Sequence, residues 1–204
     1  QNHGAPVDIL DAAETSNVLG SEMYVGSCID RRGIAINPLA FIRGIAQAAI
    51  SNGAFIFEHT KVDTFSRDNN KWQIKAAAHT ITADQILLCT NAYTDDIWPR
   101  LKRTIIPVRG YQIWTKPLRG NDRGKILKGI SCALETRRMP TGMRLHHDGR
   151  LQFSGGAGLG RERIPNINER LTAIRRIFPN ISELEVEGWW SGWVTRGIAD
   201  GWRL

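Results

Sequence analysis

The feature that most limits the possible folds is an amphipathic helix followed directly by a short apolar run. In residues 37–57, "NPLAFIRGIAQAAISNGAFIF", Asn37 can cap the helix, Pro38 suits its first position and Gly53 can end it. Apolar side chains share one face of this helix, namely Leu39, Ile42, Ile45, Ala46, Ala49 and Ile50. We expect residues 54–57 to form a buried strand, and such a helix-to-strand unit is typical of a parallel sheet.

A second apolar run lies in "QILLCTNAYTDDIWP", residues 85–99. Its core is too short for a helix and predicts another buried strand, which ends at small and polar residues. Between the two runs, "KVDTFS" and "KWQIKA" alternate around "RDNN" and predict an antiparallel insert. Ligands of open α/β sheets bind at the carboxyl ends of strands, so Thr90 and Asn91 are candidate hydrogen-bonding groups, and Ala92 leaves room.

From residue 104 the alternation predicts a second, antiparallel sheet. Its long strand is "TIIPVRGYQIWTKP" and its closing strand is "ELEVEGWWSGWVT". In "MRLHHDGRLQF", a three-residue loop with Gly149 in the left-handed conformation pairs Leu145 with Leu151 and Met143 with Phe153. Because successive side chains point to opposite faces, this register places four polar residues together on the other face: Arg144, His146, Arg150 and Gln152.

Two helical patterns complete the predicted layout. "NINERLTAIRRIF" carries an apolar stripe closed by Pro179 (Ile167, Leu171, Ile174 and Ile177). Within residues 1–20, the helical spacing of Ile9, Leu10 and Ala13 indicates the end of another helix. The chain therefore combines an α/β layer that carries an antiparallel insert with a separate antiparallel sheet. This is a mixed α/β (α+β) fold.

The composition indicates a globular protein. Of 204 residues, 42% are hydrophobic, so the chain can bury a core, and disorder is excluded. It has no apolar run of about 18 residues and no signal peptide, so we expect a cytoplasmic protein with no membrane partner. Three widely spaced cysteines predict buried thiols. Because the chain begins without Met and stops just after a strand-like segment, we expect a piece of a longer protein.

Several functional motifs are weighed and set aside. The net charge of +7 suggests a nucleic-acid binder, but the arginines are scattered in pairs and form no basic stripe, so we expect no nucleic-acid partner. "GGAGLG", residues 155–160, lacks the third glycine and the apolar helix of a dinucleotide loop, and is expected to mark a sharp bend. The five histidines are not at ligand spacing, so no metal is expected.

Five segments in order resemble a known family: "DRRGIAINPLAFIRGIAQAAISNGAFIFEHTKV", "ILLCTNAY", "IIPVRGYQIWTKPL", "DGRLQFSGG" and "WWSGWV". They look like the middle of FAD-dependent oxidoreductases of the D-amino-acid-oxidase superfamily, of the γ-glutamylputrescine oxidoreductase-like type. The resemblance spans residues 21–194 and implies part of a Rossmann-like FAD/NAD(P)-binding domain (residues 1–103), an antiparallel substrate domain (104–194) and a return toward the first domain (195–204). The family's N-terminal glycine-rich turn and C-terminal flavin segment are absent here.

The resemblance also implies site residues. Val62 would meet the adenine end of FAD, and four residues would lie near the cofactor: Thr90, Asn91, Ala92 and Tyr93. Members of the family oxidise a carbon–nitrogen bond of an amine or amino acid by passing a hydride to the flavin, often with oxygen as acceptor. Arg144, His146 and Trp190 are the substrate candidates, and no catalytic residue is assigned. The alternative is an inactive fragment or a noncatalytic binding module derived from such an enzyme.

Overall fold

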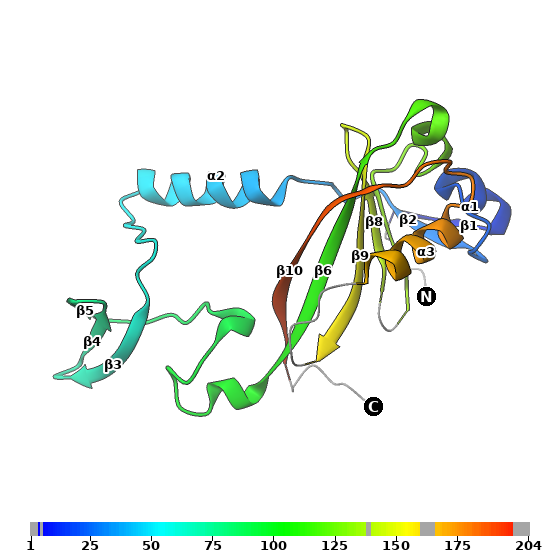
Figure 1. Ribbon diagram of the computed structural model, residues 1–204. Coiled ribbons are helices and arrows are strands. Elements are labelled where there is room, and N and C mark those ends of the chain that lie inside the picture. Colours follow the sequence, from blue (N-terminus) through cyan, green and yellow to red (C-terminus); the bar gives the residue numbers. More distant parts are fainter. Residues whose placement is uncertain (1–3, 5, 138–139, 160–165, 198–204) are drawn as a thin grey trace. The chain divides into compact units, whose positions relative to one another are not determined.

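The computed structural model describes residue 4 and residues 6–137, 140–159 and 166–197. The chain divides into two compact units (Figure 1). Unit 1 joins residues 1–35 to residues 108–194, and unit 2 joins residues 36–107 to residues 195–204. Residues 1–35 therefore group with the second sheet, whereas the sequence analysis assigned them to the first predicted domain.

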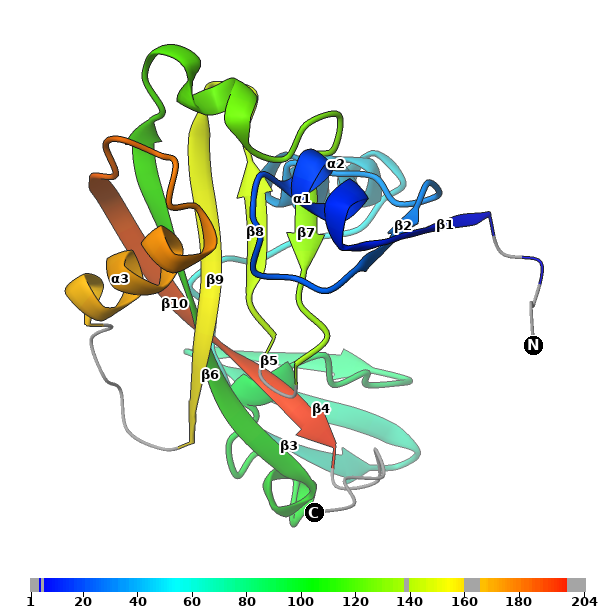
Figure 2. The same ribbon diagram turned by 90° about the vertical axis from the view of Figure 1, so that its right-hand side faces the viewer.

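Unit 1 is built on an antiparallel sheet with the strand order β10-β6-β9-β8-β7, which Figures 1 and 2 show from two sides. The predicted long strand and closing strand are both confirmed and lie side by side as β6 and β10. The strands are β6 (Ile105–Pro117), β7 (Cys132–Leu134), β8 (Gly142–Leu145), β9 (Arg150–Leu159) and β10 (Val186–Gly197).

The hairpin between β8 and β9 has the predicted register. Leu145 pairs with Leu151 and Met143 pairs with Phe153. The turn closes with a hydrogen bond of 2.9 Å from the His146 N–H to the Arg150 carbonyl, and Gly149 has a φ of 89°. That φ lies in the left-handed region, where glycine carries no steric penalty, so the loop chemistry sets the register of the sheet.

The glycine-rich run after this hairpin differs from the prediction. Residues 155–159 continue strand β9 instead of bending, with Tyr111 opposite Gly155 and Arg109 opposite Gly158. Pairing with the long strand β6 holds this segment extended, and a register shift between Arg109 and Tyr111 absorbs the extra residue. The prediction of a sharp bend is wrong for the described part of the motif.

The core of unit 1 lies between the sheet and α3 (Ile167–Ile177), which covers one face of the sheet (Figure 2). The predicted stripe of this helix is confirmed, because Ile174 and Ile177 are buried and Leu171 packs against the core. The Asn166 side chain caps the helix by accepting the Glu169 N–H. The other core residues come from the sheet and the loops beside it, including Leu118, Ile126, Met143, Leu151, Phe153, Phe178 and Leu184.

The N-terminal part of unit 1 contains a helix, as predicted, but Ile9 and Leu10 lie in a strand that precedes it. It forms β1 (Val7–Leu10), then α1 (Ala12–Leu19), then β2 (Ser27–Asp30), with β1 and β2 antiparallel. Asp11 explains the difference, because its side chain accepts the Glu14 N–H while the Glu14 carboxylate accepts the Asp11 N–H. This capping box starts the helix at residue 12, which leaves Ile9 and Leu10 outside it.

In unit 2 the predicted helix is confirmed as α2 (Pro38–Ser51). The Asn37 side chain accepts the backbone N–H groups of Leu39 and Ala40 at 3.1 Å each, and Gly53 follows the helix with a φ of 88°. Its apolar face, however, is not buried in the described structure. Side chains of this face are 48–58% exposed (Leu39, Ile42, Ile45 and Ile50).

The antiparallel insert is also confirmed, as a three-stranded meander of β3 (Val62–Asp68), β4 (Lys71–Ala76) and β5 (His79–Ala83). Asp68 pairs with Lys71 across the two-residue turn formed by Asn69 and Asn70, both of which have positive φ angles. Asparagine tolerates this conformation better than most residues. Short 3-10 helices follow at η1 (Asn91–Tyr93) and η2 (Leu101–Thr104), and unit 1 has a third, η3 (Gly120–Lys125).

Two predicted buried strands and the predicted buried thiols are wrong. Residues 54–57 and 86–88 belong to no strand, and Phe55 and Leu87 are each 86% exposed. A parallel strand needs neighbours that satisfy its backbone and layers that cover its faces, and the described residues supply neither here. Cys28, Cys89 and Cys132 are all exposed, because the first and third lie on edge strands and the second follows residues 86–88.

Candidate functional site

An open pocket of about 300 Å³ lies on the face of the sheet that points away from α3. Residues of strands β6, β7, β8 and β9 line it. Because side chains alternate along each strand, the side chains on the opposite face of the sheet fill the core. The lining combines polar and apolar groups and contains neither Asp nor Glu. It consists of Gln112, Cys132, Ala133, Leu134, Gly142, Met143, Arg144 and Gln152.

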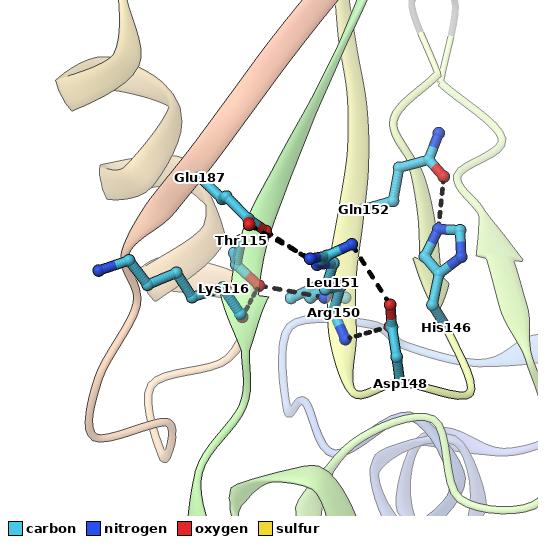
Figure 3. A network of polar contacts seen from close by, with 8 residues as sticks. All are labelled: Thr115, Lys116, His146, Asp148, Arg150, Leu151, Gln152 and Glu187. Carbon is cyan, nitrogen blue, oxygen red and sulfur yellow. Dashed lines mark hydrogen bonds and ion pairs between the residues drawn. The ribbon is translucent and has the colours of Figure 1, made fainter.

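Two arginines of the hairpin differ in how their charge is compensated. Arg150 is ion-paired with Asp148 at 3.4 Å and with Glu187 at 2.8 Å (Figure 3). The Arg150 N–H and guanidinium hold the pKa of Asp148 below its usual value. Arg144, which lines the pocket, has neither a hydrogen bond nor an ion pair within the described part of the chain. Its positive charge is therefore available to a ligand.

A chain of hydrogen bonds crosses the sheet beside the pocket. The His146 Nε2 atom lies 2.7 Å from the Gln152 Oε1 atom, as Figure 3 shows. The Gln152 amide nitrogen donates in turn to the Gln112 Oε1 atom at 3.0 Å. Residues from β6, β9 and the end of the β8 hairpin are thereby held in one arrangement.

The pocket wall also contains a close approach between β8 and β9. The Ser154 hydroxyl accepts the Gly142 N–H at 2.7 Å and donates to the Gly142 carbonyl at 3.2 Å. A Cβ atom at position 142 would lie 2.5 Å from the Ser154 Oγ atom. A larger residue at position 142 would therefore force the Ser154 hydroxyl to rotate and to give up its two hydrogen bonds with Gly142.

The three predicted substrate residues are placed differently. Arg144 lines the pocket, and His146 reaches it through Gln152. Trp190 is 53% exposed and does not line it. A Cβ atom at Gly188 would meet the Trp114 ring, so alternation along β10 places Trp190 on the same face of the sheet as Trp114.

The segments that the sequence analysis connected to FAD lie near one another in unit 2. Lys61, next to Val62 at the start of β3, is 3.5 Å from the Asp95 carboxylate beyond η1. Ring contacts add to this link, because Trp98 lies 5.6 Å from Phe65 and 6.2 Å from Trp72 between ring centroids. The structure thus joins the segment that holds Val62 to the loop that follows residues 90–93.

The 90–93 segment itself is a tight turn with exposed polar atoms. The Thr90 and Thr94 hydroxyls are hydrogen-bonded at 2.6 Å. Asn91 has a φ of 49°, and its side-chain oxygen accepts the N–H groups of Ala92 at 2.7 Å and Thr195 at 3.0 Å. Tyr93 is 66% exposed. Within the described residues the Asn91 amide nitrogen has no partner, so it can donate to a ligand.

These groups fit one part of a flavin nucleotide. The Asn91 amide nitrogen suits a hydroxyl or phosphate oxygen, and half-buried Ala92 and Val62 suit close apolar contact. The helices of the described chain are not preceded by a glycine-rich turn that could cradle a pyrophosphate. The described residues therefore fit contacts to FAD without enclosing it.

No described helix combines the length and the apolar character needed to cross a bilayer. In the same residues, no cluster of three or more His, Cys, Asp or Glu side chains could hold a metal ion.

Comparison with protein families decides the assignment. Residues 1–202 match the family model of FAD-dependent oxidoreductases, DAO. The chain belongs to this family. The predicted resemblance, the mixed α/β fold and FAD as the cofactor of the DAO family are thereby confirmed.

Individual relatives share the fold at low identity. The chain is 24% identical to probable oxidoreductase OrdL of Haemophilus influenzae and 26% identical to gamma-glutamylputrescine oxidoreductase of Escherichia coli, with 91% of this chain covered in each case. It spans only 43% and 44% of these relatives. The crystal structure of glycine oxidase from Geobacillus kaustophilus superposes with a TM-score of 0.78 at 17% identity, over 96% of this chain and 52% of that one.

Sequence reasoning missed part of the pocket. Gln112, Cys132 and Gly142 were not among the candidates, although all three line it. Gln112 lies in the predicted long strand, but the residue opposite it depends on the β6–β9 register, and no turn connects these two strands directly. Cys132 lies on a short edge strand that carries almost no alternation signal.

Proposed function

We propose that this chain is the substrate-binding part, with a portion of the FAD site, of an oxidoreductase that oxidises the carbon–nitrogen bond of an amine or amino acid. The observation that carries the proposal is Arg144, an uncompensated guanidinium in a pocket without acidic residues. A planar guanidinium binds a carboxylate through two parallel hydrogen bonds, which fixes both the position and the orientation of the substrate.

Each group has a defined part in this proposal. Arg144 holds the substrate carboxylate, and the exposed side chain of Leu134, on the same face of the sheet, packs against the rest of the substrate. Val62 and residues 90–93 contact FAD. Trp190 lies on the same face of the sheet as Arg144. When bound, FAD would supply the redox chemistry, by accepting a hydride from the carbon that bears the substrate nitrogen and passing the electrons to oxygen.

A second candidate function is supported by unit 2. The apolar face of α2 and the segment 54–57 are exposed in the described structure, so the described residues of unit 2 form no closed cavity around these side chains. In this alternative the chain is an inactive fragment or a noncatalytic binding module. It would bind an anionic ligand at Arg144 without oxidising it.

Titration of FAD separates the two candidates. FAD is added to the 204-residue chain and, separately, to the longest polypeptide that the gene encodes and that contains this chain. Flavin fluorescence and absorbance are followed in both cases. The oxidoreductase proposal expects saturable binding to at least the longer polypeptide, followed by peroxide release with an amine substrate. Binding by neither polypeptide contradicts it and favours the binding module.

The role of Arg144 has its own test with a matched control. Arg144→Met should raise KM for carboxylate-bearing amines by about 10- to 100-fold, the cost of losing a hydrogen bond to a charged group. KM for an amine without a carboxylate should change little. Arg150→Met removes a guanidinium that Asp148 and Glu187 already neutralise, and should leave both values near those of the wild type. Equal effects of the two substitutions would contradict the assignment.

A further inference from the structure

The hydrogen-bonded chain beside the pocket has a direction. A glutamine amide accepts at its oxygen and donates at its nitrogen, so each amide in a chain fixes the orientation of the next. The Gln152 oxygen faces His146 at 2.7 Å, and the Gln152 nitrogen faces the Gln112 oxygen at 3.0 Å. With the Gln152 oxygen in this position, the bond forms only when the His146 Nε2 atom carries a hydrogen and donates it.

This direction determines which end of Gln112 is free. The Gln112 oxygen is used by Gln152, and its amide nitrogen has no partner in the described structure. Gln112 and Arg144 both line the pocket, in which Asp and Glu are absent. The free polar groups that these two residues contribute are therefore hydrogen-bond donors.

The opposite direction would change the pocket. If the His146 Nε2 atom lacked a hydrogen, it would accept from the Gln152 nitrogen, and the Gln152 oxygen would accept from the Gln112 nitrogen. The Gln112 oxygen would then be free beside Arg144. A carbonyl oxygen repels a carboxylate, so the pocket would lose affinity for an anion.

We propose that His146 is a positioning residue: by donating from Nε2 it orients Gln152 and Gln112 so that the pocket presents donors to an anionic group of the substrate. The inference rests on the proposed function only in taking this pocket as the substrate site. His146 is half-buried and acts through Gln152, whereas its neighbour His147 is exposed. His147 therefore serves as the matched control.

The charged groups near the hairpin do not replace this role. Asp148 and Arg150 are paired with each other at 3.4 Å, and Arg150 is also paired with Glu187. Figure 3 shows this ion-pair cluster next to the His146–Gln152 bond, with His146 directed to Gln152. The orientation of the Gln152 and Gln112 side-chain amides is therefore coupled to the position of the hydrogen on the His146 imidazole.

The tautomer of His146 is a direct readout of the proposal. Long-range ¹H–¹⁵N correlation spectra of the 204-residue chain are recorded at about pH 9, where imidazoles in proteins are generally neutral. The His146 signals are assigned by their loss in His146→Gln. We expect the hydrogen on Nε2, whereas a hydrogen on Nδ1 would reverse the chain of amides and overturn the proposal.

Titration with acetate, the smallest carboxylate probe, tests the consequence for binding. The side-chain amide signal of Gln112 is followed in the wild type and in three variants. His146→Leu removes the donor and should weaken acetate binding by about tenfold, the effect of about 1.4 kcal/mol. His146→Gln restores a donor nitrogen at a similar distance from the backbone. The acetate affinity of this variant and that of the separate control variant His147→Leu should each stay within about twofold of the wild-type value.

The possible outcomes are distinct. Acetate binding that is unchanged in His146→Leu, or absent in the wild type, overturns the inference. Circular dichroism of His146→Leu checks that the sheet is intact. If this variant does not fold, the acetate affinity of His146→Gln and the tautomer of the wild type still test the inference. Failure of the proposed function would appear elsewhere, as absent FAD binding or absent amine oxidation, while the tautomer and the acetate titration stayed as expected.

Discussion

The helices α3 and α2 carry similar apolar stripes but lie in different environments. In unit 1, Ile174 of α3 is fully buried and Ile177 is 4% exposed, because the antiparallel sheet covers the stripe. In unit 2, Ile42 and Ile45 of α2 are 58% and 48% exposed. The comparison teaches that a helical pattern specifies the helix and the face to be buried, whereas burial itself depends on the layer that covers that face.

Replacing a central residue of each stripe should separate the units most clearly. Ile174→Ala leaves a cavity in a closed core and should lower the free energy of unfolding by about 2–5 kcal/mol. Ile45→Ala removes a half-exposed side chain and should cost less than about 1 kcal/mol. Urea unfolding followed by circular dichroism measures both. A cost for Ile45→Ala as large as that for Ile174→Ala would show that the α2 stripe is buried in solution.

Two glycine substitutions should change stability in opposite directions. In Gly188→Ala the new Cβ atom would lie 2.5 Å from the Trp114 ring, and displacing this ring should cost about 1–3 kcal/mol. Gly44 lies inside α2 with no heavy atom within 4 Å of a Cβ, so Gly44→Ala should stabilise unit 2 by about 0.5–1 kcal/mol.

Thermal unfolding of each glycine variant measures the sign. Hydrogen exchange of the α2 amides shows whether the gain in Gly44→Ala is confined to unit 2. A destabilised Gly44→Ala variant would indicate that another layer packs against that side of the helix. A neutral Gly188→Ala variant would instead show that the Trp114 ring can move freely.

The smallest expected effects concern acid stability. Hydrogen bonds from Lys125 and Ser182 lower the pKa of Asp122 in unit 1 to about 2, below the value of about 3.9 for an unfolded chain. The resulting stabilisation is fully present above about pH 4 and is lost as the pH falls toward about 2. In unit 2, the Ile97 N–H lowers the pKa of Asp95 in the same direction.

Unfolding at several pH values tests this difference. The stability gap between the wild type and Asp122→Asn should narrow from about pH 5 to about pH 2. Asp122 is only 4% exposed and connects η3 to Ser182, whereas Asp95 is exposed. The stability gap for Asp95→Asn should therefore narrow over the same pH range, but by a smaller amount. A gap for Asp122→Asn that does not change with pH would contradict the assigned hydrogen bonds.

Local chemistry made parts of unit 1 predictable from sequence. Gly149 and the alternation around it determined the register of β8 with β9, so Arg144, His146 and Gln152 were correctly placed on one face. The stripe of α3 was found because its period is that of a helix and its sheet is part of the same chain. These features depend on residues close in sequence or on a single repeating pattern.

Other features depended on contacts that no local pattern encodes. The expected strands at 54–57 and 86–88 require parallel neighbours, and apolar character alone does not supply them. The contact of Gln112 with Gln152 joins residues 40 apart in sequence and follows from the β6–β9 register. No local pattern marks Asp122 in the sequence, because its partner Ser182 comes from a distant loop.

The close approach of Gly142 and Ser154 has a consequence for how the pocket can evolve. A side chain at position 142 would collide with the Ser154 hydroxyl, so most changes at 142 require this hydroxyl to rotate and to give up its hydrogen bonds with Gly142. Loss of the serine first would free that space but would leave the Gly142 N–H without its acceptor. The order of mutations therefore matters, and homologues should carry the two positions as a covarying pair in which a larger residue at 142 accompanies a smaller one at 154.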